Sequence, residues 1–549
     1  MALSGGLWLL WLVSSAWCES SSGGGGKARS CAEVRQVYSN AGFSRTGVPQ
    51  SEISGEHLRV CPQGYTCCTS EMEENFANSS KNEFEAKLKE ASQSVQGVFA
   101  VQHKNFDGYF QDLLNKSEKS LHDTFPDLYG DLYSQHVKQF RELYVELRQY
   151  YKGTTVNLEE VLHEFWMHLL ERLFKLLNSQ YVITDEYLDC VFKLSEQLKP
   201  FGEVPRDLKL KVTRALIASR SFVLGLGVGI EVVKRVSQVS LNQDCTRAIM
   251  KLVYCPHCRG MGGAKPCLNY CRNVMKGCLA NQADLDTEWR NLVDSMLLVV
   301  DRFESPSNIE ITMTTIHERI SEAISIMQEN KKTITNKVFQ NCGNLKASTE
   351  VVGGEEKRQR RKSNMEEKAV GPALEKLVAN AKGKLKDLKD YWVILPNALC
   401  NEKVTAASTN EDKCWNGMAR GRYLPELMGD GLASQINNPE VDVDITKPDM
   451  TIRQQIMQLK IMTNRLRNAY NGNDVDYQDT SDDFSGSGSG GGCLDDLCGR
   501  KLEKSTVKKQ SDSRTVQKKA GQGVPGASSV FRPSIFLLLL LLFTTAFTT

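Results

Sequence analysis

The sequence lacks the patterns that mark the commonest enzymes and nucleic-acid-binding proteins. Its 549 residues carry a formal net charge of only +2, and no internal repeat is visible. Segments of alternating polarity rich in Val, Thr and Tyr are nearly absent, so few β-strands are expected. No Ser-His-Asp set or pair of carboxylates stands out as catalytic machinery. These absences predict an all-α protein that is not an enzyme and has no nucleic-acid partner.

Three motifs resemble known sites, but each lacks an essential part. Cys255-Pro-His-Cys258 and the cysteines after it lack the second Cys-x-x-Cys of a zinc ribbon. His163 and His168 are five residues apart, so on a helix they point about 140° apart and cannot hold one ion. Gly225–Gly229 lacks the preceding strand and the glycine spacing of a nucleotide-binding loop. We therefore expect no metal site and no dissociable cofactor.

Helical periodicity is clear in two segments of the chain. In residues 158–177, apolar side chains recur at helical spacing with glutamates between them. Residues 449–470 repeat the pattern, and Asn471-Gly472 is a typical C-terminal stop. The apolar positions are Leu158, Val161, Leu162, Phe165, Leu169, Leu173 and Leu176 in the first segment, and Ile452, Ile456, Leu459 and Leu466 in the second.

The N-terminus and the cysteine count indicate export. An apolar run from Leu7 to Val13, followed by small residues up to Cys18, predicts a signal peptide over residues 1–18. Of 17 cysteines, 17 − 1 = 16 remain after its removal, and setting aside Cys493 and Cys498 leaves 16 − 2 = 14. In an oxidising compartment this even number predicts about seven disulfides. The sequons at Asn78 and Asn115 predict N-glycosylation.

The C-terminal tail predicts a lipid anchor. Residues 536–543 are almost all Leu, but this run is shorter than the roughly twenty residues of a membrane span. Small residues, Gly526, Ala527 and Ser528, precede it by a short polar spacer. This arrangement is typical of a glycosylphosphatidylinositol (GPI) attachment signal, with residues 527–549 removed. A cleaved tail on a secreted protein is the alternative.

Three consecutive Ser-Gly dipeptides begin at Ser485, Ser487 and Ser489. They lie between Asp482-Asp483 and Asp495-Asp496, with the apolar Phe484 directly before the first of them. Ser-Gly in an acidic, extended segment of an exported protein is the acceptor pattern for glycosaminoglycan chains, because glycine leaves the hydroxyl accessible. The clustering predicts heparan sulfate on a disordered stalk over residues 480–526. The alternative is a plain Gly/Ser linker.

Two polar segments carry basic motifs. Arg358-Gln-Arg-Arg361 matches a proprotein-convertase site and lies in a predicted exposed loop over residues 348–371. Residues 500–519 hold eight Lys or Arg against Glu503 and Asp512, a net charge of 8 − 2 = +6. This basic stretch either contacts the sulfated chains or anionic head groups, or is a soluble spacer.

The ordered motifs resemble the glypican family. They are Cys61-Pro-Gln-Gly-Tyr-Thr-Cys67-Cys68, the segment Met275–Asp286, and Gln435–Asp444. Arg420–Glu426 and Asp495–Cys498 are similar to one branch of that family. The resemblance implies an elongated all-α core over residues 19–479, with the pairing Cys31–Cys67, Cys61–Cys255, Cys68–Cys258, Cys190–Cys342, Cys245–Cys278, Cys267–Cys414 and Cys271–Cys400.

The resemblance also implies a function. The expected protein is a GPI-anchored heparan sulfate proteoglycan of the outer leaflet of the plasma membrane, with a fraction shed to the extracellular space. It would act as a co-receptor for heparin-binding growth factors and morphogens such as fibroblast growth factors, Wnt, Hedgehog and BMP, together with their receptors. The alternative is direct ligand binding by the folded core, with the chains auxiliary.

Overall fold

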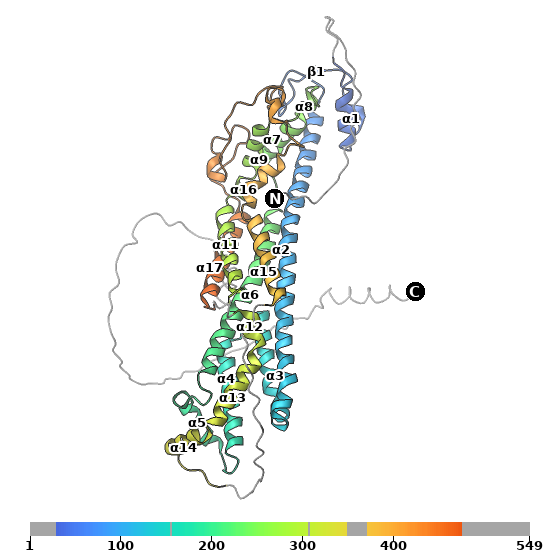
Figure 1. Ribbon diagram of the computed structural model, residues 1–549. Helices are drawn as coiled ribbons and strands as arrows, with labels where there is room; N and C mark the ends of the chain where they lie inside the picture. Colours follow the sequence, from blue (N-terminus) through green and yellow to red (C-terminus); the bar gives the residue numbers. More distant parts are fainter. Residues whose placement is uncertain (1–28, 154–155, 306–307, 348–370, 475–549) are drawn as a thin grey trace, which may run out of the picture. The chain divides into compact units, whose positions relative to one another are not determined.

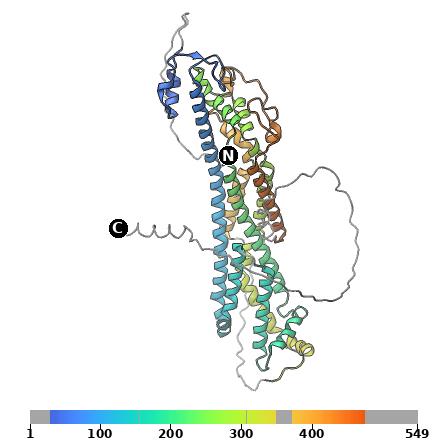
Figure 2. The same ribbon diagram turned by 180° about the vertical axis from the view of Figure 1, so that it is seen from behind.

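The structure is a computed structural model that describes residues 29–474, apart from 154–155, 306–307 and 348–370. The chain divides into two compact units, Met1–Asp482 and Asp483–Thr549, and every described residue belongs to the first. That unit is built almost entirely of helices (Figures 1 and 2). The predicted all-α fold is therefore confirmed. The described part adds one small antiparallel sheet, in which Ile53 pairs with Thr66 and Ser54 with Tyr65.

The elements follow one another with mostly short connections. They are α1 (Ala32–Asn40), η1 (Arg45–Gly47), β1 (Ile53–Ser54), β2 (Tyr65–Thr66), α2 (Ser70–Tyr129), α3 (Asp131–Lys152), α4 (Leu158–Leu177), α5 (Asp185–Leu198), α6 (Val204–Val236), α7 (Gln243–Val253), α8 (Cys255–Cys258), α9 (Leu268–Cys278), α10 (Ala280–Ala283), α11 (Asp286–Arg302), α12 (Ile309–Thr314), α13 (Ile316–Glu329), α14 (Lys331–Cys342), α15 (Pro372–Leu388), α16 (Tyr391–Leu399), η2 (Ser408–Lys413), η3 (Leu432–Gln435) and α17 (Met450–Asn471).

Helix α2 is the longest element and connects the two regions of the core. Its 60 residues span about 90 Å at the α-helical rise. The Thr69 side chain caps its start by accepting a hydrogen bond from the Met72 N–H, and it ends at Gly130, which has φ = 55°. Its buried side chains run the full length of the helix, from Met72 to Phe125. One end packs against α7, and the remainder packs against α6, α12 and α3.

The first region is a helical bundle around α6, α11 and α17. These helices contact one another, and α6 also packs along α2. Helix α6 is long and apolar enough to cross a membrane, but 72% of its most apolar window is buried inside the protein, as expected for a core helix. The glycines of the segment Gly225–Gly229 allow neighbouring side chains to pack closely against α6. A Cβ on Gly229 would lie 2.7 Å from the Phe99 ring, and one on Gly225 would contact Leu466.

The second region is cysteine-rich and lies at the N-terminal end of α2. It gathers α1, the small sheet, α7, α8, α9, α16 and the irregular residues 401–448 (Figure 1). Its buried cluster contains eleven cysteines, whereas the buried cluster of the bundle contains none. The core of the bundle is therefore aromatic and aliphatic, whereas the core of the second region is rich in cysteine, although both belong to the same compact unit.

Both helices expected from periodicity are present. Helix α4 spans Leu158–Leu177, as predicted, and α17 begins one residue after its cap, Asp449. Gly472 ends α17 with φ = 84°, which confirms the predicted stop. Most of the apolar positions are buried, although Leu176 is 38% exposed at the end of its helix.

Candidate functional site

The predicted modification sites of the termini lie outside the described residues. These are the signal peptide, the acceptors Ser485, Ser487 and Ser489, the basic stretch 500–519, the GPI segment Gly526–Ser528, and the cleavage site at Arg361 within 348–370. They remain predictions. The last residue that the structure describes is Asp474, eleven residues before Ser485.

A buried polar contact holds the last described residue against the bundle. The Tyr150 hydroxyl donates a hydrogen bond of 2.7 Å to Asp474 Oδ2. Burial, together with the Asp474 carboxylate, raises the pKa of Tyr150 well above its ordinary value, so the phenol remains a donor. The Arg220 guanidinium lies 4.6 Å from the centre of the Tyr150 ring and adds a cation–π contact. The Tyr150 hydroxyl therefore holds Asp474 beside α3, and Arg220 of α6 packs on the same ring.

A small cavity lies at the last turn of α17. It has a volume of about 190 Å³ and is lined by residues of α6, the segment between α11 and α12, and the last turn of α17. Arg302 donates a hydrogen bond of 3.0 Å to the Tyr470 carbonyl and lies over the Tyr470 ring. Lys211 and Arg214 line the same cavity from α6. The end of α17 is thus bordered by cations.

The cysteine-rich region is locked by disulfides. Six of the seven bridges in the described part of the chain lie there, and the seventh joins α5 to α14. The seven bridges are Cys31–Cys67, Cys61–Cys255, Cys68–Cys258, Cys190–Cys342, Cys245–Cys278, Cys267–Cys414 and Cys271–Cys400. These are the same pairs that the family resemblance implies. Adjacent Cys67 and Cys68 each bond to a different segment, as their geometry requires.

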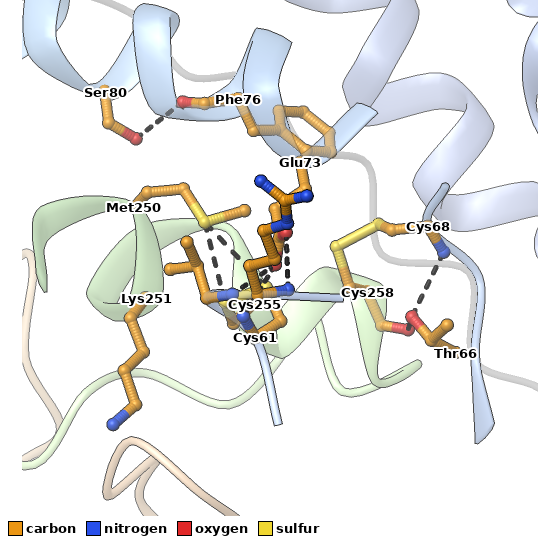
Figure 3. Close-up of a disulfide and its surroundings, with 12 residues drawn as sticks. Cys61, Thr66, Cys68, Glu73, Phe76, Ser80, Met250, Lys251, Cys255 and Cys258 are labelled. Carbon is orange, nitrogen blue, oxygen red and sulfur yellow. Dashed lines mark hydrogen bonds between the residues drawn. A yellow bond between two sulfur atoms is a disulfide. The ribbon is translucent and has the colours of Figure 1, made fainter. Parts of the chain in front are cut away.

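A buried carboxylate organises the loop that carries Cys61. Glu73 is only 5% exposed, and its oxygens accept hydrogen bonds of 2.8 Å from the N–H groups of Arg59, Val60 and Cys61. Figure 3 shows this side chain pointing from α2 to the Cys61–Cys255 bridge, with Cys68–Cys258 beside it. Charge-assisted bonds of this kind are stronger than neutral ones. Glu73 therefore fixes the loop that carries Cys61 to helix α2.

The cysteines of the zinc-like motif are all engaged in bridges. Cys255 and Cys258 bond to Cys61 and Cys68, and the described residues contain no group of three or more potential metal ligands. Burial lowers the pKa of His257 within this motif, and the Glu33 carboxylate at 3.7 Å offsets part of that effect. His163 and His168 are exposed on α4. None of these motifs forms a metal site in the described part of the chain.

Two disulfides cross the predicted cleavage loop. Cys267 and Cys271 precede residues 348–370, and their partners Cys414 and Cys400 follow them. Helix α15, directly after the loop, packs on α11 and α2, and its last residue accepts a hydrogen bond from Trp289 Nε1. A cut at Arg361 would therefore leave one covalently joined and packed particle.

The irregular segment after α16 is held by buried polar side chains of α9. Asn273, fully buried, donates to the Glu426 carbonyl and accepts from the Met428 N–H. Lys276 donates to the Met428 carbonyl at 2.8 Å and pairs with Asp430 at 2.9 Å. This segment includes the motifs at 420–426 and 435–444 and presents exposed Leu424 and Ile436. It is thus irregular but specifically anchored.

Both predicted N-glycosylation sites lie on α2. Asn78 and Asn115 are exposed, but the serines that complete the sequons, Ser80 and Ser117, are only 2% and 1% exposed. Ser80 donates to the Phe76 carbonyl within the helix, and Ser117 bonds to the Met313 carbonyl in α12. Because a transferase must reach the sequon hydroxyl, attachment at either site is expected before α2 packs.

An apolar hollow lies at the C-terminal end of α2. It has a volume of about 310 Å³, within the usual range of ligand pockets. Its walls come from α2, α3, α4 and α13, and its charged lining residues are Arg172, Lys175 and His136, with no carboxylate among them. The apolar lining is Phe125, Tyr129, Tyr133, Phe140, Leu169, Leu173, Leu176 and Ile324.

Comparisons with known proteins decide the family. The chain matches the glypican family model over residues 10–547. Glypican-1 of Gallus gallus is 64% identical over 533 residues, which cover 97% of each chain. The chain belongs to the glypican family. Glypicans are proteoglycan core proteins of the cell surface, not enzymes, so the predicted class of protein is confirmed.

Solved structures similar to this chain show the same fold. A C-terminally truncated glypican-1 is 58% identical, with a TM-score of 0.74, and covers 82% of this chain and 100% of its own. Dally-like protein in complex with O-palmitoleoyl serine is 32% identical, with a TM-score of 0.65, and covers 81% of this chain and 100% of its own. The motifs at 420–426 and 495–498 predicted similarity to glypican-1, in agreement with the first of these structures and the Gallus gallus relative.

Sequence reasoning missed both cavities of this glypican core. The apolar hollow takes its lining from four helices, and the cationic cavity takes its lining from three separate segments. No local motif marks either set. Periodicity assigns Leu176 to the core, and its 38% exposure appears only in the structure.

Proposed function

We propose that this glypican is a GPI-anchored heparan sulfate proteoglycan that captures heparin-binding growth factors and morphogens for signalling receptors. One observation carries the proposal: a member of the glypican family has three Ser-Gly acceptors in an acidic segment that follows a folded core. Fibroblast growth factors, Wnt, Hedgehog and BMP proteins are the expected ligands. The activity requires no dissociable cofactor, only the covalent chains and the lipid.

The mechanism follows from charge and tethering. Chains on Ser485, Ser487 and Ser489 would convert a core of formal net charge +2 into a strong polyanion. Such a polyanion attracts basic ligands over a distance set by the ionic strength. Several chains on one core bind a ligand repeatedly, which raises its apparent affinity. Attachment at Gly526, Ala527 or Ser528 would confine this capture to the outer leaflet, next to the receptors.

The disulfide-locked core suits this role. Its last described residue, Asp474, is held by the Tyr150 hydroxyl of α3. Cleavage at Arg361 would leave that particle intact, because Cys267–Cys414 and Cys271–Cys400 cross the loop. The core then acts as a rigid support, and ligand capture belongs to the chains.

Binding of a fibroblast growth factor to cells tests this proposal. Cells displaying the wild-type protein should bind the ligand in a salt-sensitive manner, and a Ser485→Ala/Ser487→Ala/Ser489→Ala variant should lose most of that binding. Matched expression at the surface, and release of both proteins by a phospholipase specific for GPI, are the controls. Full retention of binding by the triple variant would reject the chains as the capturing element.

A second candidate function is direct ligand binding by the core, which the apolar hollow favours. A cavity of about 310 Å³ with aromatic and aliphatic walls suits an acyl chain, and Dally-like protein has been solved with O-palmitoleoyl serine. We propose that this hollow accepts a lipid-modified serine. Leu176→Glu should abolish binding of a palmitoleoylated peptide to the chain-free core, whereas Leu210→Glu, similarly exposed on α6, should not.

A further inference from the structure

The cavity beside the last turn of α17 has an unbalanced positive lining. Lys211, Arg214 and Arg302 line it, and its only carboxylate comes from Asp207. That carboxylate is already engaged, with Arg319 at 2.7 Å and Lys211 at 3.0 Å. Arg214 and Arg302 have no carboxylate partner among the described residues. The cavity therefore has cationic groups that an anion from outside the core can approach.

A buried amide without a hydrogen-bond partner among the described residues belongs to the wall of the same cavity. Asn308 lines it and is only 2% exposed. Its Oδ1 caps α12 by accepting a hydrogen bond of 2.9 Å from the Ile311 N–H. Its Nδ2 has no hydrogen-bond partner within the part of the chain that the structure describes. A buried donor left unpaired costs about 1–3 kcal/mol, so a ligand oxygen that reached this donor through a small shift of the wall would be favoured.

The size of the cavity limits its ligand. At about 190 Å³ it is smaller than most drug-sized pockets, and Phe303, Ile309 and Tyr470 supply an apolar floor. One ring-sized group with anionic oxygens fits this combination of apolar floor, cationic rim and unpaired donor. A sulfated or carboxylated sugar ring has these properties.

We propose that this cavity binds one sulfated or carboxylated sugar residue of the heparan sulfate attached to this same chain. The inference rests on the proposed function. Gly472 lines the cavity, and Ser485 follows 13 residues later, within about 45 Å even when fully extended. A polyanion that begins so near is present at a high effective concentration. The site would hold the root of the sugar chain against the core.

The test uses the full chain with Ser485, Ser487 and Ser489 replaced by Ala, together with a heparin hexasaccharide. The readout is local hydrogen exchange over residues 208–216 and 466–474, because the basic stretch 500–519 also attracts the probe. The hexasaccharide should slow exchange in both segments at 50 mM salt. It should slow exchange less at 200 mM. Absence of protection in either segment would overturn the proposal.

Asn308→Asp is the sharpest variant. Aspartate retains the N-cap of α12 but replaces the unpaired donor with a negative charge, so the local affinity should fall about tenfold or more. Asn242→Asp is the matched control. Asn242 lies in the cysteine-rich region and caps α7 in the same way, because its Oδ1 accepts a hydrogen bond from the Cys245 N–H. Equal behaviour of the two variants would reject the site. Lys211→Gln/Arg214→Gln, which keeps Asn308, should also weaken protection.

A second arm identifies the source of the sugar. The glycanated wild-type protein should show slow exchange in residues 208–216 without added hexasaccharide, and glycanated Asn308→Asp should not. Fast exchange in the glycanated wild type would contradict binding of its own chain. Failure of the proposed function is seen separately, as the absence of lyase-sensitive chains on the wild-type protein.

Discussion

The two regions of this glypican core are stabilised in different ways. In the bundle, buried aromatic and aliphatic side chains of α2, α6, α11 and α17 form a cluster without a buried cysteine. In the cysteine-rich region, short helices and irregular segments depend on six disulfides and on buried polar side chains such as Glu73 and Asn273. The difference shows that helical periodicity suffices where long helices pack, and that covalent and polar bonds replace it where the backbone is irregular.

The largest expected effect in the bundle comes from Trp289→Ala. Trp289 is fully buried, contacts the rings of Phe99 and Trp392, and donates a hydrogen bond of 2.9 Å to the Leu388 carbonyl. We expect a loss of about 3–5 kcal/mol in the free energy of unfolding, measured by chemical denaturation. Trp289→Phe, which fills most of the volume, should cost clearly less. Equal costs would mean that the hydrogen bond, not packing, governs this position.

The corresponding test in the cysteine-rich region removes one bridge. Cys68→Ala/Cys258→Ala deletes a disulfide that joins segments 190 residues apart. The expected loss is about 2–5 kcal/mol, and limited proteolysis should begin near the Cys61 loop. The bundle should keep its near-ultraviolet signal from Trp289. Loss of native structure in both regions at once would show that they unfold as one unit and are not stabilised independently.

A smaller effect is expected when one buried charge is altered. Glu73→Gln keeps the shape of the side chain but replaces charge-assisted bonds to three N–H groups with weaker ones. We expect a loss of about 2 kcal/mol, read from the denaturant midpoint. Glu74→Gln, next to it but exposed, is the control and should change stability little. A cost below that of the control would mean that Glu73 does not organise the loop.

Two glycine substitutions of opposite expected sign test helix packing in the bundle. Gly229→Ala should cost about 1–3 kcal/mol, because the added Cβ would lie 2.7 Å from the Phe99 ring. Gly227→Ala, two residues away in the same helix, finds its nearest neighbour at 3.9 Å. It should stabilise the protein by up to about 1 kcal/mol through helix propensity. Opposite signs in thermal unfolding would confirm that packing, not helix propensity, requires Gly229.

The sequence predicts the bundle better than the cysteine-rich region. The boundaries of α4 and α17 follow from apolar spacing and from Asn471-Gly472, because these local signals coincide with the tertiary packing. The long helix α2 and the partners of each cysteine do not follow in this way. Cys61 and Cys255 are 194 residues apart, and no local rule selects that pair among the alternatives. The family resemblance supplied the pairing.

The candidate sites also differ in whether the sequence alone predicts them. Ser485, Ser487 and Ser489 are predictable because a transferase reads a short extended motif. The apolar hollow and the cavity at Asn308 are not, since each depends on residues that only the fold brings together. Asn308 would have been read as an ordinary helix cap. Its buried Nδ2, which has no hydrogen-bond partner among the described residues, distinguishes it.

Electrophoresis of the mature protein tests whether this core carries heparan sulfate on Ser485, Ser487 and Ser489. The mature protein should migrate as a broad band of high mass that collapses to a sharp core band after heparan sulfate lyase treatment. The Ser485→Ala/Ser487→Ala/Ser489→Ala variant should give the sharp band from the start. A sharp, lyase-insensitive band from the wild-type protein would contradict the account and leave direct binding by the helical core as the function.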